Sequence, residues 1–255
     1  MRQLTIVKVG GKIVEDSESL SIFLSDFALI AGDKILVHGG GRSATLLAEK
    51  LGIKTVMVDG RRITDSEMLK VVTMVYAGLV NKNIVAQLQK LRIDAIGLTG
   101  TDLNLILSEK RPVKDIDYGF AGDVKKVNAQ AFLELLKLNY LPVIAPITHD
   151  RKGNLLNTNA DTVATEIAKS LTFDYYVRLI FCFEKGGVLL NEADENSVIP
   201  DLNYELYQQY KNEGIIHGGM IPKLDNAFQA IAAGVKEVII TKASDFKKGK
   251  GTLIK

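Results

Sequence analysis

A lysine lies inside an apolar stretch that is typical of a buried strand, and a pair of glycines follows it. Lys8 belongs to Leu4–Val9, and Gly10 and Gly11 come directly after that segment. Charged side-chain ends are almost never buried without a partner. In a parallel sheet, ligands bind outside the carboxyl ends of the strands. We therefore expect the Lys8 ammonium to lie in a cleft at this edge, although a lysine reaching solvent from an edge strand would give the same pattern.

A second strand-to-glycine turn, in KILVHGGGRSATLLAEKLG (34–52), is suited to binding an anion. Gly39, Gly40 and Gly41 have no side chains, so their N–H groups can face a ligand at the start of the following helix. The stretch lacks the Gly-Lys-Ser/Thr of a Walker A loop and the G-x-G-x-x-G spacing of dinucleotide-binding folds. A tight structural turn without a ligand is the alternative.

Two further segments place polar or charged side chains at the start of a helix. Asn157, Asn159 and Asp161 alternate in NTNAD, which puts them on the same side of an extended segment, whereas a helix N-cap needs only one of them. Lys223 lies in the first turn of a helix that begins near Pro222, where a cation opposes the helix dipole. A bound anion would reverse that penalty, and a surface lysine is the alternative.

The remaining candidates are arginines and histidines. Arg61 and Arg62 follow a turn, and an arginine can hold a carboxylate through two hydrogen bonds. We expect one of them to bind a ligand and the other to be a surface charge. His38, His149 and His217 are dispersed along the chain, which makes a zinc site improbable. No Ser-His-Asp or Cys-His arrangement for nucleophilic catalysis is evident.

Two lysines, several glycine turns, an arginine and paired amides describe a site for phosphates and a carboxylate. A side-chain carboxylate with a pKa of about 4.3 is ionised at neutral pH, so its attack on a γ-phosphoryl group needs no general base. Catalysis then depends on aligning the reactants and neutralising the transferred group. We expect Lys8 and Lys223 to contact phosphate oxygens from different lobes, with Asp161 holding both ammonium groups and Mg²⁺ bridging the phosphates.

Short apolar runs alternate with helix-period segments, as in an α/β protein with a mainly parallel sheet. The expected strands are Leu4–Val9, Lys34–His38, Ala95–Thr99, Leu141–Ile147, Tyr175–Phe183 and Glu237–Thr241. The expected helices are Ser17–Ala31, Ser43–Leu51, Asp65–Leu91, Ala129–Leu138, Asp161–Leu171, Leu202–Asn212 and Pro222–Ala233. The turn-rich segment 107–128 predicts hairpins that project from the sheet edge.

Length and composition fit two lobes that share one sheet, with a boundary near residues 171–174. The 255 residues are 47% hydrophobic with a net charge of +2, which allows a large core and indicates neither nucleic acid nor a membrane surface as partner. The single cysteine, Cys182, lies in an apolar run and favours a reducing cytoplasm. No apolar run approaches 18 residues and the N-terminus lacks a secretory pattern, so we expect no membrane span.

Six motifs occur in one order along essentially the whole chain: VKVGGK, VHGGG, GRRIT, NTNAD, GGMIPK and GTLIK. As an ordered set they resemble the acetylglutamate kinases of the amino acid kinase family. The resemblance implies an α/β fold, a three-layer αβα sandwich with a central, mainly parallel sheet, as in carbamate kinase-like proteins. Its N-terminal lobe (1–172) would bind the acylglutamate and form a homodimer through helix 65–91, and its C-terminal lobe (173–255) would bind ATP.

The resemblance also implies a role for each motif residue. Lys8 and Lys223 would stabilise the transition state, and Asp161 would organise them. The substrate residues would be Gly40, Gly41, Arg62, Asn157 and Asn159. The nucleotide residues would be Gly10, Gly11, Glu184, Gly187, Leu189, Ile215, His217 and Gly219. Mg²⁺ would be held mainly by the ATP phosphates rather than by protein ligands. Glu184 stands where the family usually has an aspartate, which is the one departure in the pattern.

The activity that the resemblance implies is ATP-dependent phosphorylation of the side-chain carboxylate of N-acetylglutamate, in arginine biosynthesis. The chain begins directly with its first strand, without the extra helix of the family's arginine-inhibited hexamers, which favours a dimer insensitive to arginine. The motifs do not distinguish an acetyl group from a succinyl group. A kinase for carbamate, aspartate, glutamate or UMP, and a nucleotide-binding sensor without catalysis, are the remaining alternatives.

Overall fold

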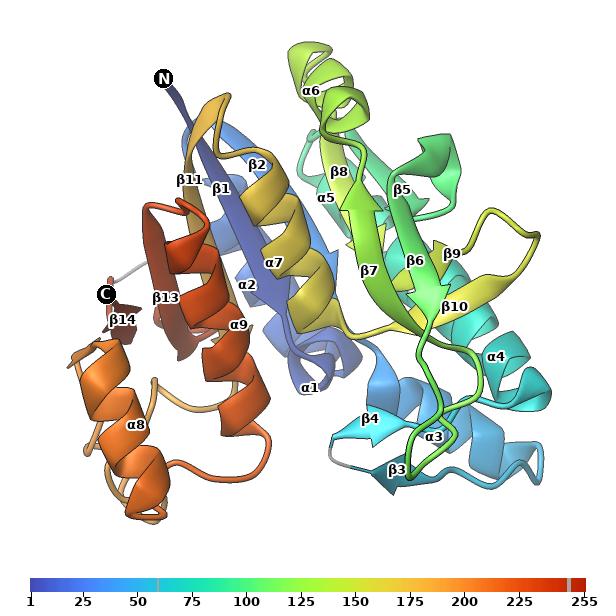
Figure 1. Ribbon diagram of the computed structural model, residues 1–255. Coiled ribbons are helices and arrows are strands. Elements are labelled where there is room, and N and C mark those ends of the chain that lie inside the picture. Colours follow the sequence, from blue (N-terminus) through green and yellow to red (C-terminus); the bar gives the residue numbers. More distant parts are fainter. Residues whose placement is uncertain (59, 247–248) are drawn as a thin grey trace.

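An eight-stranded, mainly parallel sheet runs through the middle of the molecule (Figure 1). The structure is a computed structural model that describes residues 1–58, 60–246 and 249–255. The order of the strands is β12 (Asp201–Leu202), β14 (Thr252–Ile254), β13 (Glu237–Lys242), β11 (Tyr175–Phe183), β1 (Arg2–Val9), β2 (Asp33–His38), β8 (Leu141–Ala145) and β5 (Ala95–Thr99). All adjacent pairs are parallel except β13 with β14. All six predicted strands are present, and one of them, Leu141–Ile147, ends earlier than predicted.

Helices cover both faces of this sheet, so the three-layer expectation is confirmed (Figure 1). One layer contains α6 (Ala129–Lys137), α7 (Ala160–Ser170), α8 (Tyr204–Asn212) and α9 (Met220–Ala232). The other contains α1 (Gly11–Glu15), α2 (Ser17–Ala28), α3 (Gly41–Lys50), α4 (Ser66–Thr73), the π-helical segment η1 (Met74–Val80) and α5 (Asn81–Lys90). Each layer packs its own hydrophobic core against one face of the sheet.

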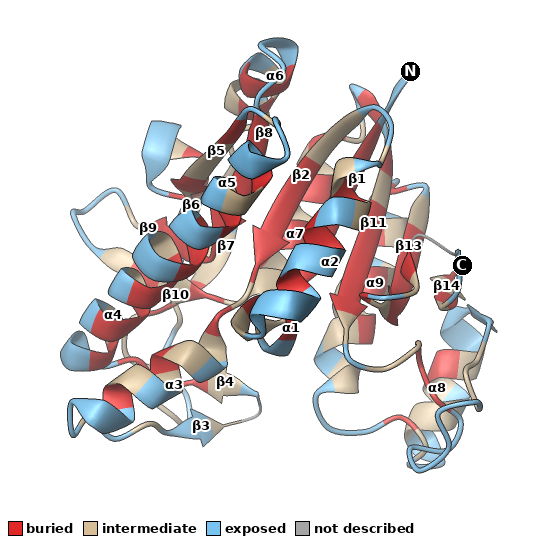
Figure 2. Ribbon diagram, turned by 180° about the vertical axis from the view of Figure 1, so that it is seen from behind, coloured by how far each residue is buried: buried red, intermediate tan, exposed pale blue. Residues whose placement is uncertain are grey.

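The alternation of side chains along β1 explains the two cores and the direction of Lys8. Leu4 and Ile6 belong to the core beneath α7, and Val7 and Val9 belong to the core beneath α2. Because successive side chains point to opposite faces, Lys8 continues the face of Leu4 and Ile6. Both faces of the central strands are buried (Figure 2), and burying such strands on both sides is typical of parallel sheets.

The long predicted helix 65–91 is present, but its middle is π-helical rather than α-helical. α4, η1 and α5 follow one another without a break. By length and composition the 25-residue stretch Ser66–Lys90 is the one helix of the described chain that could cross a membrane, and 44% of its most apolar window is buried in the fold. Val71, Val75 and Ile84 lie in the core against the sheet, as expected for a core helix of a globular protein.

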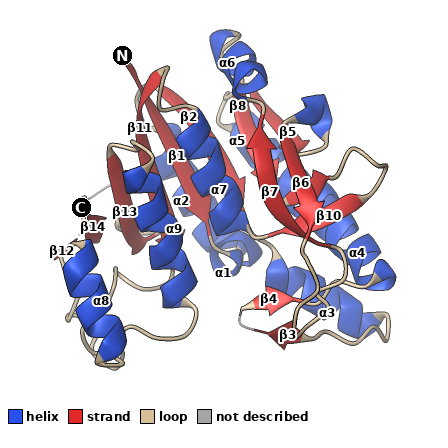
Figure 3. Cartoon of the chain, viewed as in Figure 1, coloured by secondary structure: helices blue, strands red, loops and turns tan. Residues whose placement is uncertain are grey.

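Smaller strands lie beside β8 and β5 at one side of the sheet, and β3 and β4 lie below them (Figure 3). β6 (Ile106–Lys110) and β7 (Ala121–Val127) form the hairpin expected within 107–128, and together with β9 (Ile147–His149) and β10 (Leu155–Thr158) they make a small closed sheet. The predicted strand Leu141–Ile147 is wrong at its end, because β8 stops before Pro146, which lacks the N–H that a ladder needs. β3 (Met57–Val58) pairs with β4 (Arg61–Arg62), and η2 (Asp102–Asn104) is a short 3₁₀ turn.

Candidate active site

Two lysines from distant parts of the chain meet on a single carboxylate. Lys8 Nζ lies 2.8 Å from Asp161 Oδ1, and Lys223 Nζ lies 2.7 Å from Asp161 Oδ2. The three side chains are only 11%, 13% and 15% exposed, in the order Lys8, Asp161, Lys223. The predicted arrangement, with Asp161 between two ammonium groups, is therefore present in the structure.

The local sequence explains how Asp161 reaches this place. Asn159 is the N-cap of α7, and its Oδ1 accepts hydrogen bonds from the N–H groups of Asp161 and Thr162. The capping role considered for this segment therefore belongs to Asn159, which leaves the Asp161 side chain free to bind cations. Asp161 is already helical, so the argument from alternation holds only for Asn157 and Asn159. Lys223 comes from α9, which begins at Met220, two residues earlier than predicted.

The charges of the cluster determine how its members titrate. Burial lowers the pKa of Lys8, and Lys223 adds to that effect, while Asp161 acts in the opposite direction. Burial alone would raise the pKa of Asp161, but Lys8 and Lys223 together hold it well below its usual value. The carboxylate is therefore ionised across the physiological range. Two ammonium groups and one carboxylate leave a net positive charge in a site shielded from water, which favours an anion.

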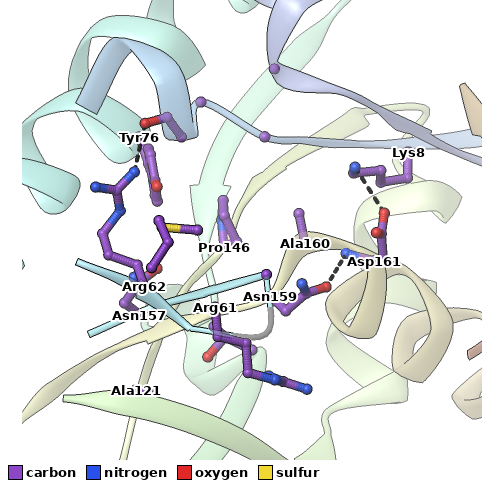
Figure 4. Close-up of a pocket in the computed structure, with 17 residues that line it drawn as sticks. Lys8, Arg61, Arg62, Tyr76, Ala121, Pro146, Asn157, Asn159, Ala160 and Asp161 are labelled. Carbon is purple, nitrogen blue, oxygen red and sulfur yellow. Dashed lines mark hydrogen bonds and ion pairs between the residues drawn. The ribbon is translucent and has the colours of Figure 1, made fainter. Parts of the chain in front are cut away.

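A cavity of about 230 Å³ lies on the Lys8 side of this cluster (Figure 4). Its lining contains Lys8 and Asp161 together with all five predicted substrate residues, Gly40, Gly41, Arg62, Asn157 and Asn159. Gly11 also lines it: a Cβ there would lie 3.8 Å from the nitrogen atoms of Gly40 and Gly41. The two glycine turns therefore face each other across the end of the sheet, where anions can meet backbone N–H groups.

Arg62 is a buried cation held by uncharged groups. It is 7% exposed, and its Nη2 donates to the Gly41 carbonyl at 2.7 Å and to Thr45 Oγ1 at 2.9 Å. Among the described residues, no carboxylate forms an ion pair with it. Asn157 Nδ2 donates to Thr64 Oγ1 at 3.0 Å beside it. Arg61 lines the same cavity instead of being a plain surface charge, and burial and Arg111 lower its pKa. The cavity thus offers fixed positive charge to a carboxylate.

A second cavity, of about 420 Å³, lies on the Lys223 side. Lys223 and six of the predicted nucleotide residues line it, namely Glu184, Gly187, Leu189, Ile215, His217 and Gly219. Gly11 instead lines the first cavity, and Gly10 lines neither, because its N–H donates to the Cys182 carbonyl at 2.9 Å and extends the sheet. An apolar lining next to a lysine and a glycine turn suits the base of a nucleotide and the phosphates attached to it.

Several lining residues were not found from the sequence. Tyr76 lies in η1, and its ring packs on Gly40, where an added Cβ would come within 2.9 Å of Tyr76 Cδ1. Only its apolar character was visible in the helix pattern. Glu192 lines the second cavity and lies 3.3 Å from Lys185 Nζ and 3.5 Å from His217 Nε2. It comes from an irregular loop, which has no periodicity to detect.

Glu184 is engaged by a partner from the other half of the chain. Its carboxylate forms an ion pair with the ammonium of Lys12, one residue after the first glycine pair. Both side chains are about half exposed, so this contact adds little to stability. The described residues contain no group of three or more His, Cys, Asp and Glu that could hold a metal ion. The expected Mg²⁺ therefore stays a prediction.

Comparisons with known proteins give one consistent answer. The sequence model of the amino acid kinase family matches residues 3–242. The chain is 61% identical to the acetylglutamate kinase of Parabacteroides distasonis over 254 residues, which cover 100% of both chains. It is 39% identical to the acetylglutamate kinase of Methanopyrus kandleri, with 99% of this chain and 100% of the relative covered.

Solved structures extend the likeness to the fold. The protein smu.665 of Streptococcus mutans UA159 superposes with a TM-score of 0.82 at 26% identity, covering 98% of both chains. Carbamate kinase from Giardia lamblia bound to AMP-PNP superposes with a TM-score of 0.72 at 14% identity, covering 99% of this chain and 98% of that one. The carbamate kinase-like fold expected from the motifs is confirmed.

Proposed function

The chain belongs to the amino acid kinase family, and we propose that it acts as an acetylglutamate kinase in arginine biosynthesis. Full-length identity of 61% to one acetylglutamate kinase and 39% to a distant one supports this activity. The enzyme uses ATP to phosphorylate the side-chain carboxylate of N-acetylglutamate, and the products are the acyl phosphate and ADP. The single observation that carries the proposal is the joining of two cavities at Lys8, Asp161 and Lys223.

The chemistry of this reaction fits a site without a general base. The attacking carboxylate is already ionised at neutral pH, so no proton has to be removed. A carboxylate oxygen forms a bond to the γ-phosphorus, and the bond to the β,γ-bridging oxygen breaks, leaving ADP. Lys8 approaches the transferred group from the first cavity and Lys223 from the second. Asp161 fixes both ammonium groups before the reactants arrive, which avoids reorganisation in the transition state.

The first cavity is the proposed acylglutamate site. Arg62 would hold the substrate's α-carboxylate, since the cavity presents its buried charge without an acidic partner among the described residues. Gly40 and Gly41 would donate backbone N–H groups, and Asn157 and Asn159 would contact the acylamino group. The placement of all five residues on one lining supports these roles. N-succinylglutamate, with one more carboxylate, stays an alternative substrate, because Arg61 also lines this cavity.

The second cavity is the proposed ATP site. The base would lie against Leu189 and Ile215, and the phosphates would extend past Gly219 toward Lys223. Gly11 would meet the γ-phosphate from the first lobe. Mg²⁺ would be held mainly by phosphate oxygens, and its chemistry there is to neutralise phosphate charge. Residues 1–172 would thus form the acylglutamate lobe and residues 173–255 the ATP lobe. We further propose a cytoplasmic homodimer that contacts through Ser66–Lys90.

A substrate panel tests the activity. ADP release is measured with MgATP and, separately, N-acetylglutamate, N-succinylglutamate, glutamate, aspartate, carbamate and UMP. We expect turnover with an N-acylglutamate and none with free glutamate. Turnover of neither acyl form would refute the proposal, and the ratio of the two acyl rates decides between acetyl and succinyl.

A lysine variant separates an enzyme from a sensor. Lys8→Ala should lower kcat about 10²–10³-fold, since it removes one preorganised charge from the transition state. Lys125→Ala is the control, because Lys125 is 54% exposed and forms its ion pair with Glu109, away from both cavities. Unchanged ATP affinity and unchanged cellular function in Lys8→Ala would favour a non-catalytic nucleotide sensor.

A further inference from the structure

A fully buried histidine lies directly beneath the glycine turn of the acylglutamate cavity and has no part in the proposed chemistry. His38 is the last residue of β2 and is 0% exposed. Its Nδ1 lies 2.7 Å from the carbonyl oxygen of Gly39, and its Nε2 lies 3.1 Å from Nδ2 of Asn81, the first residue of α5. Both ring nitrogens therefore have a partner.

These partners determine which nitrogen carries the proton. A carbonyl oxygen only accepts, so Nδ1 must carry the hydrogen that it shares with Gly39. The Asn81 amide is oriented independently, because its Nδ2 also donates to the Val143 carbonyl at 2.9 Å and its Oδ1 accepts from Lys82 Nζ at 3.1 Å. Asn81 thus presents a donor to His38, and Nε2 must accept. Burial also lowers the pKa of His38 to about 4, so the ring is neutral when the enzyme works.

We infer that His38, fixed as the neutral Nδ1–H tautomer by Asn81, is a positioning residue that holds the glycine turn open toward the acylglutamate. Gly39 is fixed at both ends: its N–H donates to the Val9 carbonyl at 3.0 Å, and its carbonyl accepts from His38. With Gly39 fixed, the following amides of Gly40 and Gly41 lie on the cavity lining rather than turning into the sheet.

The long helix Ser66–Lys90, which contains Asn81, also contacts the glycine turn through a second residue. Tyr76 in η1 packs on Gly40, and Asn81 follows η1 directly. π-helical segments often occur at functional sites. Gly97 on β5 leaves the space that Asn81 needs, since a Cβ there would lie 2.0 Å from Asn81 Oδ1. The residues Tyr76, Asn81 and His38 therefore link the long helix to the substrate turn. This inference rests on the proposed function only in naming the acylglutamate as the ligand of the turn.

Two substitutions of the same residue separate the two hydrogen bonds. An Asn amide can place its nitrogen near the position of Nδ1, so His38→Asn keeps the donor to Gly39 and loses the acceptor for Asn81. A Gln amide can place its oxygen near the position of Nε2, so His38→Gln keeps the acceptor and loses the donor. Each variant loses one buried hydrogen bond, and we expect similar decreases in the midpoint of thermal unfolding.

Steady-state kinetics then test the positioning role. We expect His38→Gln to raise KM for the acylglutamate on the order of tenfold and to change KM for ATP less than twofold. His38→Asn should keep both KM values within twofold of the wild type. Equal KM values in the two variants, with equal losses of thermal stability, would mean that His38 is only structural and would overturn the inference. An inactive wild type would refute the proposed function instead.

Nitrogen NMR of the imidazole tests the tautomer without any activity. With ¹⁵N-labelled histidine, the His38 ring should show a protonated Nδ1 and an unprotonated Nε2 at pH 7. A protonated Nε2 would overturn the inference even if the enzyme is active, because the ring would then be unable to accept from Asn81. If that ring is also neutral, its Nδ1 cannot donate to Gly39.

Discussion

At the scale of single residues, the site depends on Asp161, because its carboxylate forms ion pairs with two buried ammonium groups. Replacing it with Asn keeps the shape and removes the charge, so Lys8 and Lys223 would repel each other at close range. Breaking a buried ion pair by removing one partner typically costs about 3–5 kcal/mol. Part of this cost can be relieved by deprotonation, since burial already lowers the pKa of Lys8.

We therefore predict that Asp161→Asn lowers the free energy of unfolding by about 3 kcal/mol and abolishes measurable turnover. Urea unfolding and the ADP-release assay measure the two effects. Glu166→Gln on the same helix is the matched control, because the ion pair of Glu166 among the described residues is with Lys169, one turn away. The substitution should change stability by less than about 0.5 kcal/mol. A urea midpoint for Asp161→Asn equal to that of the control would contradict the prediction.

The buried His38 predicts how stability depends on pH. Its pKa is about 4 in the folded chain and about 6.5 when unfolded. Between these values the unfolded chain binds more protons, so the free energy of unfolding falls as the pH falls from about 6.5 toward 4. For one fully buried group this loss is about 3 kcal/mol at pH 4. Asp161 adds a loss at lower pH, because its depressed pKa stabilises the fold only while the carboxylate is ionised.

Urea midpoints measured from pH 7.5 to pH 4.5 check this prediction. His38→Asn should lose most of the decrease between pH 6.5 and 4.5, since it has no imidazole to protonate. A wild-type profile that is flat over this interval would show that His38 is protonated in the folded state.

At the scale of elements, periodicity in the sequence predicted the long strands and helices but not the irregular segments. Leu4–Val9 and Tyr175–Phe183 were found because apolar runs between turns have few other interpretations. The motifs predicted that Lys8, Asp161 and Lys223 come together, and the structure brings them into contact. Lys8 lies near the end of β1, and the other two residues lie in the first turns of α7 and α9. The π-helical character of Met74–Val80 could not be predicted, because an apolar stripe looks alike at both helical pitches. The strands β3 and β4 and the loop that contains Glu192 could not be predicted either, because their conformations depend on contacts distant in sequence.

The turn η2 contains a backbone conformation that its sequence does not favour. Leu103 has φ 51° and ψ 19°, in the left-handed region, and is 60% exposed. A residue with a Cβ pays about 1–2 kcal/mol there, and glycine does not, although glycine loses more entropy on folding. Leu103→Gly should therefore raise the free energy of unfolding by about 0.5–1 kcal/mol.

Urea unfolding measures this change. Leu138→Gly is the control, because Leu138 is equally exposed at 66% but has an ordinary φ of −81° at the end of α6. It should lower stability by about 0.4–1 kcal/mol, because glycine gives the unfolded chain more conformational freedom to lose. Both substitutions remove an exposed leucine, so a difference of opposite sign isolates the backbone effect. Equal destabilisation by the two variants would contradict strain at Leu103.

At the scale of the whole molecule, one sheet carries both halves of the site. β1 pairs with β11 from Arg2 to Val9, so Lys8 on β1 and the second cavity, at the end of β11, are held by the same ladder. The two proposed substrates, one in each cavity, would then meet beside Asp161. This geometry suits direct transfer between two bound substrates.

The outer face of the long helix is where the molecule would meet its second copy. Met74 and Leu79 are 54% and 59% exposed, although their neighbours Val75 and Val80 are buried in the core. Exposed apolar side chains on a helix next to the end strand β5 suit an interface that repeats symmetrically. Tyr76 in η1 belongs to the same helix and lines the proposed acylglutamate cavity. An ordered interface on this helix would therefore also restrict the motion of Tyr76.

We therefore predict that the wild type sediments at about twice 27.9 kDa and that Met74→Glu with Leu79→Glu sediments as a monomer. Carboxylates buried face to face at the centre of the contact would be desolvated without partners. The control variant is Leu138→Glu with Phe173→Glu. These two large apolar side chains lie outside the long helix and are 66% and 89% exposed. A monomeric wild type would refute the dimer, and a dimeric Met74→Glu, Leu79→Glu variant would place its interface elsewhere.

If the interface restricts the motion of Tyr76, the monomeric variant should also show a higher KM for the acylglutamate with little change in KM for ATP.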